Sequence, residues 1–239
     1  MSTRTFSPRI AIALAGVVAA VTLTMAADAP TPDESLMRLK AGNARFVANA
    51  AEPLPVDAAK RLALVGGQHP FATILSCADS RVPPEIVFHT GLGDLFVVRA
   101  AGEATDRSVL ASIEYSTEHL HVPLVVVLGH ESCGAVKSTL ETPETQSLGP
   151  NLDYLLKQIR PAVNRAATAS SDARLRAAIL ENVEEQINDM LSGSAMLKHQ
   201  AEQGEIGIVG AYYELGSGVV HFTERVKVTP SADHKPAAE

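Results

Sequence analysis

The chain has 239 residues, of which 27 are acidic and 20 are basic, so its formal net charge at pH 7 is −7. This acidic balance is a poor match for nucleic acid, whose phosphates select clustered lysine and arginine. Tryptophan is absent and aromatic residues make up only 4% of the chain, so the core must be built from valine, leucine, isoleucine and alanine.

The first segment resembles an export signal. Arg4 and Arg9 precede an uninterrupted apolar run over 10–25, and alanines follow at positions 26, 27 and 29. This order is typical of a secretory signal peptide. The run is shorter than the about 20 residues of a membrane span, which favours cleavage over an uncleaved anchor. No paired arginines precede it, so the twin-arginine route is not indicated. We expect residues 1–27 to be a Sec-type signal peptide, which makes the mature protein periplasmic, without stable membrane contact.

Cleavage would leave a chain of single-domain length. The leader holds two of the 20 basic residues and none of the 27 acidic ones, so the mature net charge becomes −9. We expect one domain over 28–228. The final segment 229–239 (TPSADHKPAAE) is polar and proline-containing, and we expect it to be a disordered tail.

Hydrophobic spacing predicts the following elements in chain order: helices at 31–50 and 56–64, strands at 72–76 and 95–99, a helix at 108–120, a strand at 123–128, helices at 133–140, 151–167, 171–191 and 192–203, and strands at 205–213 and 219–222. The strand 123–128 (PLVVVL) is apolar on both faces, which is typical of a parallel sheet covered by helices on both sides. A glycine-rich turn before 219–222 indicates an antiparallel hairpin. We therefore predict an α/β fold with a mainly parallel central sheet flanked by helices and an antiparallel C-terminal edge hairpin.

The two cysteines follow two of these strands. Cys77 ends the first strand within ATILSCADSR, and GHESCGA places His130 and Cys133 three residues apart after the strand 123–128. In an oxidising compartment two cysteines favour a disulfide. However, if the two strands are neighbours, the three side chains meet beyond their carboxyl ends. Two sulfurs and one imidazole then form a zinc site whose fourth position is open to water, as in catalytic sites.

Asp79 and Arg81 could help such a zinc to activate its bound water. Two thiolates cancel the charge of the metal and weaken its effect on a bound water. Asp79 could accept a hydrogen bond from that water, and Arg81 could hold Asp79 ionised and oriented. The stretch CADSR then contains one metal ligand and the groups that support it.

The CADSR and HESC stretches resemble the C-x-D-S-R and H-x-x-C signature of the β-class carbonic anhydrases. Further segments match in order, and the resemblance runs from about residue 33 to residue 225. These segments are Val82-Pro83, GLGDLFVVR, Ser112 to Tyr115, and Glu181 to Val183 with Gln186.

The resemblance implies reversible hydration of CO₂ to bicarbonate and a proton by attack of zinc-bound hydroxide. It implies one Zn²⁺ per subunit on Cys77, His130 and Cys133, with Asp79 and Arg81 as the catalytic dyad. In some members the aspartate closes the site by binding the metal, under control of a bicarbonate pocket that contains a tryptophan. The matching position here is Ile74, so we expect the open form, with Asp79 as a fourth ligand only in a closed form.

The resemblance also implies where CO₂ binds. Gln68 matches a substrate-binding glutamine, and Phe96 and Tyr115 match aromatic positions of the CO₂ pocket. In the family this pocket takes walls from two subunits, so a homodimer or a dimer of dimers is implied. Ala100 and Glu103 stand where members often have asparagine, which leaves the hydrogen bonding of that loop open.

Two other functions fit parts of the sequence. The same site could hydrolyse a CO₂ analogue, carbonyl sulfide or carbon disulfide. Alternatively, the protein could be a non-enzymatic zinc or thiol redox protein, or a metal-homeostasis protein, that uses Cys77 and Cys133; this reading does not explain Asp79 or Arg81. His89 is the best candidate for a proton carrier because it lies near the CADSR segment.

Overall fold

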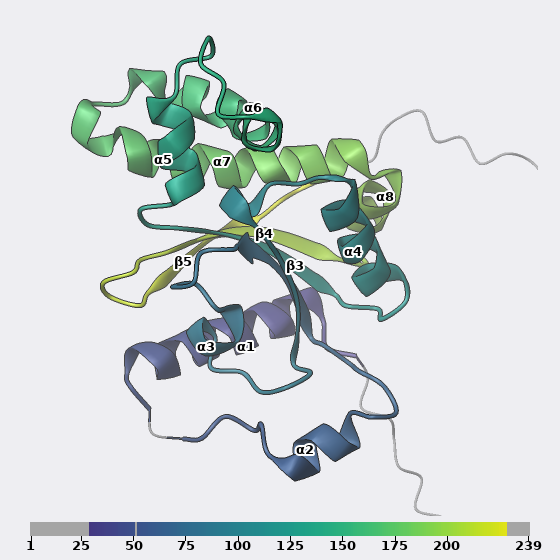
Figure 1. Cartoon of the computed structure of the whole chain (residues 1–239). Coiled ribbons are helices and arrows are strands. Elements are labelled where there is room, and N and C mark those ends of the chain that lie inside the picture. Colours follow the sequence, from purple (N-terminus) through teal and green to yellow (C-terminus); the bar gives the residue numbers. More distant parts are fainter. Residues whose placement is uncertain (1–28, 51, 229–239) are drawn as a thin grey trace, which may run out of the picture.

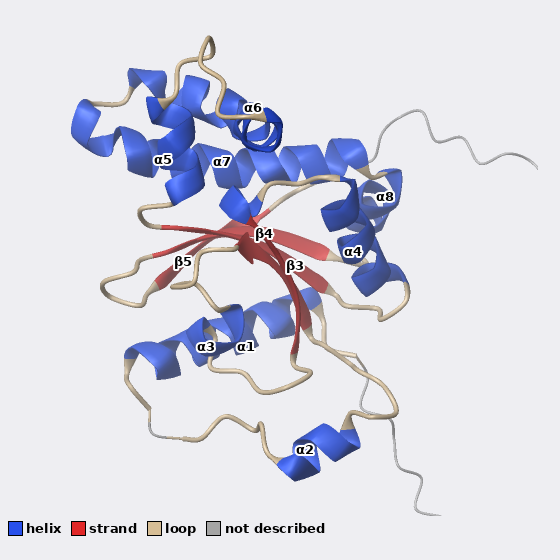
Figure 2. Cartoon of the chain, viewed as in Figure 1, coloured by secondary structure: helices blue, strands red, loops and turns tan. Residues whose placement is uncertain are grey.

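The computed structural model describes residues 29–50 and 52–228, so the expected signal peptide and C-terminal tail lie outside the described residues. It has a five-stranded sheet between two layers of helices (Figures 1 and 2). Its elements, in chain order, are α1 (Pro32–Val47), α2 (Ala58–Ala63), β1 (Ala72–Cys77), α3 (Pro84–Val87), β2 (Leu95–Ala100), η1 (Ala101–Glu103), α4 (Arg107–Glu118), β3 (Leu124–His130), α5 (Gly134–Glu141), α6 (Pro150–Arg165), η2 (Ala166–Thr168), α7 (Ser171–Gly193), α8 (Ala195–Gln203), β4 (Gly207–Tyr213) and β5 (Val220–Arg225).

The sheet confirms the predicted fold class. Its strand order is β2-β1-β3-β4-β5; the first four strands are parallel and β5 pairs antiparallel with β4 at the edge. The chain leaves β1 toward β2 on one side and later returns to β3 on the other side. This reversal places the switch point of the sheet between β1 and β3, and open α/β sheets bind ligands beyond the carboxyl ends of the strands at such a point.

The apolar strand β3 explains the two-layered core. Leu124, Val126 and Leu128 pack into the cluster that includes side chains of α1 and of the α3 segment. The intervening Val125 and Val127 point to the opposite cluster, with side chains of α4, α7 and α8. Because successive side chains of a strand face opposite ways, a strand covered on both sides has no polar face.

The sequence did not predict α3, and it misplaced several element ends. The four-residue α3 is too short to show a hydrophobic period. The strand β4 begins at Gly207 and not at 205, because Gly204 ends α8 in the left-handed conformation with φ of 74°. The N–H group of Glu205 then donates to the carbonyl oxygen of Gln200 and extends the helix cap. The strand β5 runs three residues further than the predicted 219–222.

A single glycine sets the packing of α1 against the α3 segment. A Cβ atom at Gly42 would lie 1.9 Å from the carbonyl oxygen of Phe88. The helix backbone therefore approaches the neighbouring backbone as closely as only glycine allows. The side chain of Asn43 closes the same contact by donating to the carbonyl oxygens of Val87 and Gly218.

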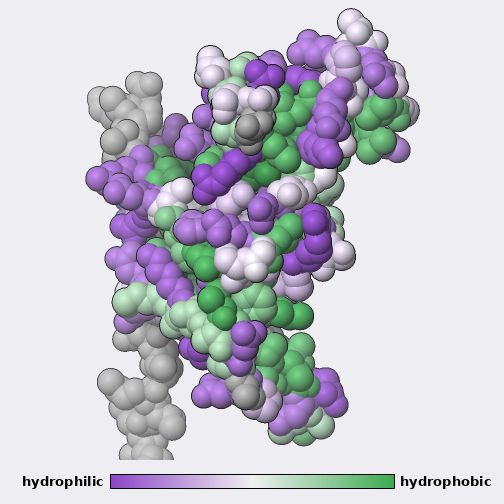
Figure 3. Space-filling view, turned by 90° about the vertical axis from the view of Figure 1, so that its left-hand side faces the viewer, coloured by the Kyte–Doolittle hydropathy of each residue, from purple (hydrophilic) through white to green (hydrophobic). Residues whose placement is uncertain are grey.

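The surface carries apolar side chains away from the core. Leu62 and Val65, in and just after α2, are 75% and 81% exposed, and Figure 3 shows hydrophobic surface at the height of α2. Over residues 29–50 and 52–228, no helix is both long enough and apolar enough to cross a membrane.

Candidate metal centre

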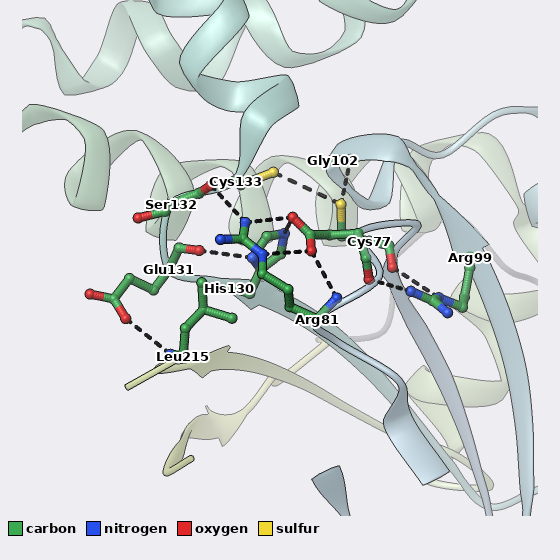
Figure 4. A network of polar contacts seen from close by, with 10 residues as sticks. Cys77, Arg81, Arg99, Gly102, His130, Glu131, Ser132, Cys133 and Leu215 are labelled. Atoms are coloured by element: carbon green, nitrogen blue, oxygen red, sulfur yellow. Dashed lines mark hydrogen bonds and ion pairs between the residues drawn. The ribbon is translucent and has the colours of Figure 1, made fainter. Parts of the chain in front are cut away.

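The centre lies at the carboxyl ends of β1 and β3, which are neighbours as the sequence required. Cys77 is the last residue of β1, His130 is the last residue of β3, and Cys133 immediately precedes α5. Between His130 and Cys133, Ser132 adopts a left-handed backbone with φ of 56°, which turns the chain back toward β1. Glu131 is exposed, and its carboxylate accepts the N–H of Leu215 and fixes this turn (Figure 4).

The three predicted ligands converge. Their ligand atoms all lie within 4.8 Å of one another, and all three residues are buried. Both cysteines are free thiols, and Figure 4 shows their sulfur atoms directed toward each other, 4.0 Å apart. Two sulfurs on one tetrahedral zinc, each about 2.3 Å from the metal, are about 3.8 Å apart. The observed separation therefore suits a shared metal and is far longer than a disulfide bond of about 2.05 Å.

The imidazole of His130 provides an independent test of metal fit. Its Nδ1 lies 2.8 Å from the carbonyl oxygen of Glu131, and because a carbonyl only accepts, Nδ1 carries the proton. The other nitrogen, Nε2, then presents a lone pair, yet it is buried without a hydrogen-bond partner in the part of the chain that the structure describes. A metal ion supplies what this nitrogen lacks, since ligating histidines characteristically donate their second N–H to a carbonyl or carboxylate.

The two thiols differ in acidity. The hydrogen bond from Cys133 lowers the pKa of Cys77 most, and the backbone N–H of Gly102, 3.3 Å from its sulfur, also contributes. The same pairing raises the pKa of Cys133, because a second thiolate would lie beside the first. The pairing thus favours one thiolate and disfavours the second, and a divalent cation would stabilise both sulfurs in the ionised form.

Asp79 and Arg81 form a two-point ion pair beside the ligands. The Arg81 Nε atom donates to Asp79 Oδ1 at 2.9 Å, and Nη2 donates to Oδ2 at 2.6 Å. These bonds hold the pKa of Asp79 well below the ordinary carboxyl value. Asp79 Oδ2 lies 3.9 Å from Nε2 of His130, so the carboxylate borders the place where the three ligands point.

Arg99 is a residue of the site to which the sequence analysis assigned no role. Its guanidinium donates to the carbonyl oxygens of Cys77 and Asp79, at 3.0 Å and 2.5 Å (Figure 4). It comes from β2, the strand next to β1, and fixes the loop between the first ligand and the carboxylate. A sequence signal existed, since Arg99 ends the matched GLGDLFVVR segment.

The predicted substrate-binding residues do not lie at the metal centre of the same chain. Gln68 is exposed in the loop between α2 and β1. Phe96 on β2 pairs with Thr73 on β1, whereas the ligand Cys77 pairs with Ala100. Phe96 is therefore four residues, or about 13 Å along the strand, from the level of the metal centre. Tyr115 on α4 is 48% exposed, and its ring centroid is 6.3 Å from that of Phe96. The single chain thus forms an aromatic pair at the sheet edge, separate from its own metal centre.

Two other sequence positions are also located. Ile74 is buried in the core, in the middle of β1. His89 lies in the turn after α3 with a left-handed backbone, φ of 47°.

A parallel α/β sheet that presents one imidazole and two thiols at its switch point has the ligand set of a catalytic zinc enzyme. A carbonic anhydrase family profile matches residues 72–220. Carbonic anhydrase 2 of Mycobacterium tuberculosis is 40% identical over 183 residues, which cover 75% of this chain and 87% of that protein. The chain belongs to the β-carbonic anhydrase family.

Solved structures agree with this assignment. The Coccomyxa β-carbonic anhydrase in complex with acetazolamide superposes with a TM-score of 0.65 and 25% identity, over 72% of this chain and 80% of that one. A tetrameric β-carbonic anhydrase from Sordaria macrospora gives a TM-score of 0.62 and 26% identity, over 70% of this chain and 86% of that one. Family, fold and ligand set together favour a carbonic anhydrase over a hydrolase of a CO₂ analogue and over a redox protein.

Proposed function

We propose that the protein is a lyase that catalyses the reversible hydration of CO₂ to bicarbonate and a proton, with one Zn²⁺ held by Cys77, His130 and Cys133. The observation that carries the proposal is the buried Nε2 of His130, which has no hydrogen-bond partner in the described chain and lies within 4.8 Å of two free thiols in a β-carbonic anhydrase fold. Zinc at this point supplies Lewis acidity that lets water act as a nucleophile near neutral pH.

Asp79 is the group that orients this water. Its carboxylate remains ionised because Arg81 donates to both of its oxygens, so it would accept a hydrogen bond from a water bound at the metal and orient that water. Engagement of both oxygens by Arg81 also favours the open form, in which Asp79 does not bind the metal. Arg99 keeps the Asp79 backbone in place by bonding its carbonyl oxygen.

Activity with and without metal tests the proposal. Purified protein with stoichiometric zinc should accelerate acidification of CO₂-saturated buffer, and a chelator should abolish the effect. Replacement of Asp79 by Asn should lower kcat/KM by about 10²-fold or more while zinc stays bound. The matched control is Asp153→Asn. The Asp153 carboxylate accepts hydrogen bonds from Ser147 and Leu148, in the segment before α6, and not from residues of the metal centre. Full activity of the Asp79 variant, or inactivity of zinc-loaded wild type, would refute the assignment.

A second copy of the chain completes the CO₂ pocket. The edge strand β2 is only half-buried, unlike β1 and β3, and the Phe96–Tyr115 pair lies beside it with Tyr115 exposed. Gln68, Phe96 and Tyr115 would then line the metal centre of the partner. The assembly is a homodimer or a dimer of dimers; the Sordaria macrospora relative is tetrameric.

Subunit complementation tests this arrangement. A Cys77→Ser chain lacks a metal ligand, and a Phe96→Ala/Tyr115→Ala chain lacks the pocket wall. Mixed after reversible dissociation, the two should regain activity, because one of the two sites in each heterodimer is intact. No recovery in confirmed heterodimers would place the aromatic residues outside the partner's site.

Export to the periplasm is supported by the order of positive, apolar and small residues over 1–27. The measurement is fractionation of a producing bacterium, followed by N-terminal sequencing of the protein. A mature N-terminus near residue 28 in the periplasmic fraction is expected. Full-length protein confined to the cytoplasm would contradict export.

A further inference from the structure

A buried acidic residue stands behind the metal centre without a role in the chemistry above. Glu103 ends η1, the short turn that follows β2, and its exposed fraction is 0%. Its Oε1 accepts a hydrogen bond from Asn182 Nδ2 at 3.0 Å, and its Oε2 is buried without a partner among the described residues. Its backbone is left-handed, with φ of 44°, a conformation that costs a residue with a Cβ about 1 kcal/mol. Such a residue persists only where its surroundings hold it in place.

The surroundings of Glu103 connect directly to Cys77. The same Nδ2 of Asn182 that bonds Glu103 also donates to the carbonyl oxygen of Gly102, at 2.8 Å. On its other side, the N–H of Gly102 donates to the sulfur of Cys77 at 3.3 Å (Figure 4). The Gly102 residue is thus held from one side by Asn182 and presents its N–H to the metal ligand on the other.

Two glycines make room for this arrangement. Gly102 has a left-handed backbone with φ of 62°, and a Cβ there would lie 2.7 Å from Ile159 Cδ1, so both conformation and packing favour glycine at the residue that bonds Cys77. A Cβ at Gly129 would lie 2.6 Å from Val183 Cγ2 and 3.3 Å from Oε1 of Glu103. The carboxyl group of Glu103 therefore packs against β3 one residue before His130.

Helix α7 anchors the carboxyl group from behind. Gln186 Nε2 donates to Asn182 Oδ1 at 3.2 Å, and Gln186 Oε1 accepts the N–H of Thr105 at 2.8 Å. Two side chains one turn apart on α7 therefore bind both ends of the 102–105 segment. Burial raises the pKa of Glu103 to about 8, and the charge of Cys77 adds to this. The role of the carboxyl group in this network is geometric, since its Oε1 accepts the hydrogen bond from Asn182.

We propose that Glu103 and Asn182 are positioning residues of the metal centre, which hold Gly102 so that its N–H reaches the sulfur of Cys77. This bond orients the thiolate and partly neutralises it. The inference rests on the metal site of the proposed function but not on CO₂ as the substrate.

The test measures zinc affinity of the full chain by competition with a chromophoric chelator, which requires no CO₂ turnover. Replacement of Glu103 by Ala removes one of the two acceptors that orient Asn182 Nδ2, and zinc affinity should fall by about 10- to 100-fold. The conservative Glu103→Gln variant keeps an acceptor oxygen and should restore zinc affinity to within about threefold of wild type, well inside the expected loss. Hydrogen exchange of the Gly102 amide, measured by NMR, should accelerate in the alanine variant and slow again in the glutamine variant.

Gln200→Ala is the matched control. Gln200 is a buried amide on α8 that bonds an acidic side chain, Glu118 at the end of α4, and makes no contact with the ligand network described above. Its loss should lower stability but leave zinc affinity and Gly102 exchange unchanged. If Glu103→Ala does not fold, Asn182→Ser carries the same prediction, because it shortens the donor to both Gly102 and Glu103. A folded Glu103→Ala or Asn182→Ser protein with wild-type zinc affinity overturns the proposal. A loss in Glu103→Gln as large as in Glu103→Ala overturns it as well.

Discussion

The protonation of Glu103 should be measurable as a pH-dependent contribution to stability. In the folded chain burial raises the pKa of this carboxyl from 4.5 to about 8. The unfolded chain releases the proton near pH 4.5, whereas the folded chain retains it up to about pH 8. The stabilising contribution is therefore complete below pH 4.5 and is lost as the pH rises toward 8. Each pH unit in this window removes about 1.4 kcal/mol, so the whole window amounts to at most about 5 kcal/mol.

The Glu103→Gln variant isolates this contribution, because glutamine does not titrate. Urea unfolding of both metal-free proteins at pH 5, 6, 7 and 8 gives two free energies of unfolding at each pH. Groups common to both proteins cancel in the difference. The free energy of the variant minus that of wild type should rise with pH across this range. A difference that stays constant, or falls, would show that Glu103 is not held protonated and would refute the reasoning.

Three further predictions follow from the site and the core. Chelation of zinc should make Cys77 and Cys133 reactive toward a disulfide reagent, since one of the two thiols has a lowered pKa; equal reactivity before and after chelation would argue against a shared metal. Arg81→Lys should lower kcat/KM by about tenfold or more with zinc retained, because an ammonium group cannot make the two-point contact with a carboxylate; unchanged kinetics would remove the need for that geometry. Gly42→Ala should lower the free energy of unfolding, measured by urea titration, by about 3 kcal/mol, because the new Cβ would lie 1.9 Å from a backbone oxygen. The control Gly66→Ala, whose Cβ would have no atom within 4 Å, should have little effect in the same titration.

The parts of the fold that sequence reasoning could predict are those set by short-range patterns. The unbroken apolar stretch of β3 predicts a strand covered on both faces, and the structure buries all of its residues. The spacing of His130 and Cys133 predicts two ligands on one turn, and both lie in the metal centre. The C-x-D-S-R pattern places a carboxylate and its guanidinium partner two residues apart, close enough to pair within one loop. These predictions depend on residues that are neighbours in the sequence.

The sequence could not place residues whose partners are distant in the chain. Arg99 bonds carbonyl oxygens about twenty positions earlier, and a backbone acceptor leaves no mark on the sequence. Glu103 looked like a departure that could disturb its loop, but Asn182, 79 positions later, supplies the donor that makes an acid acceptable there. Phe96 and Tyr115 were predicted as pocket residues, but only the strand register shows that Phe96, with Tyr115 beside it, lies far from the metal centre of its own chain.

The amino-acid sequence by itself determined the α/β class, the ligand types and the carboxylate that accompanies them, because hydrophobic period and ligand spacing are local properties. Tertiary structure decided that β1 and β3 are adjacent, which brings Cys77 within 4.0 Å of Cys133 across 56 positions. It also decided that Nε2 of His130 is buried without a partner and that α7 anchors the turn behind Cys77. These features arise from strand order and helix packing, which bring distant side chains together through the burial of apolar surface and not through any spacing along the chain.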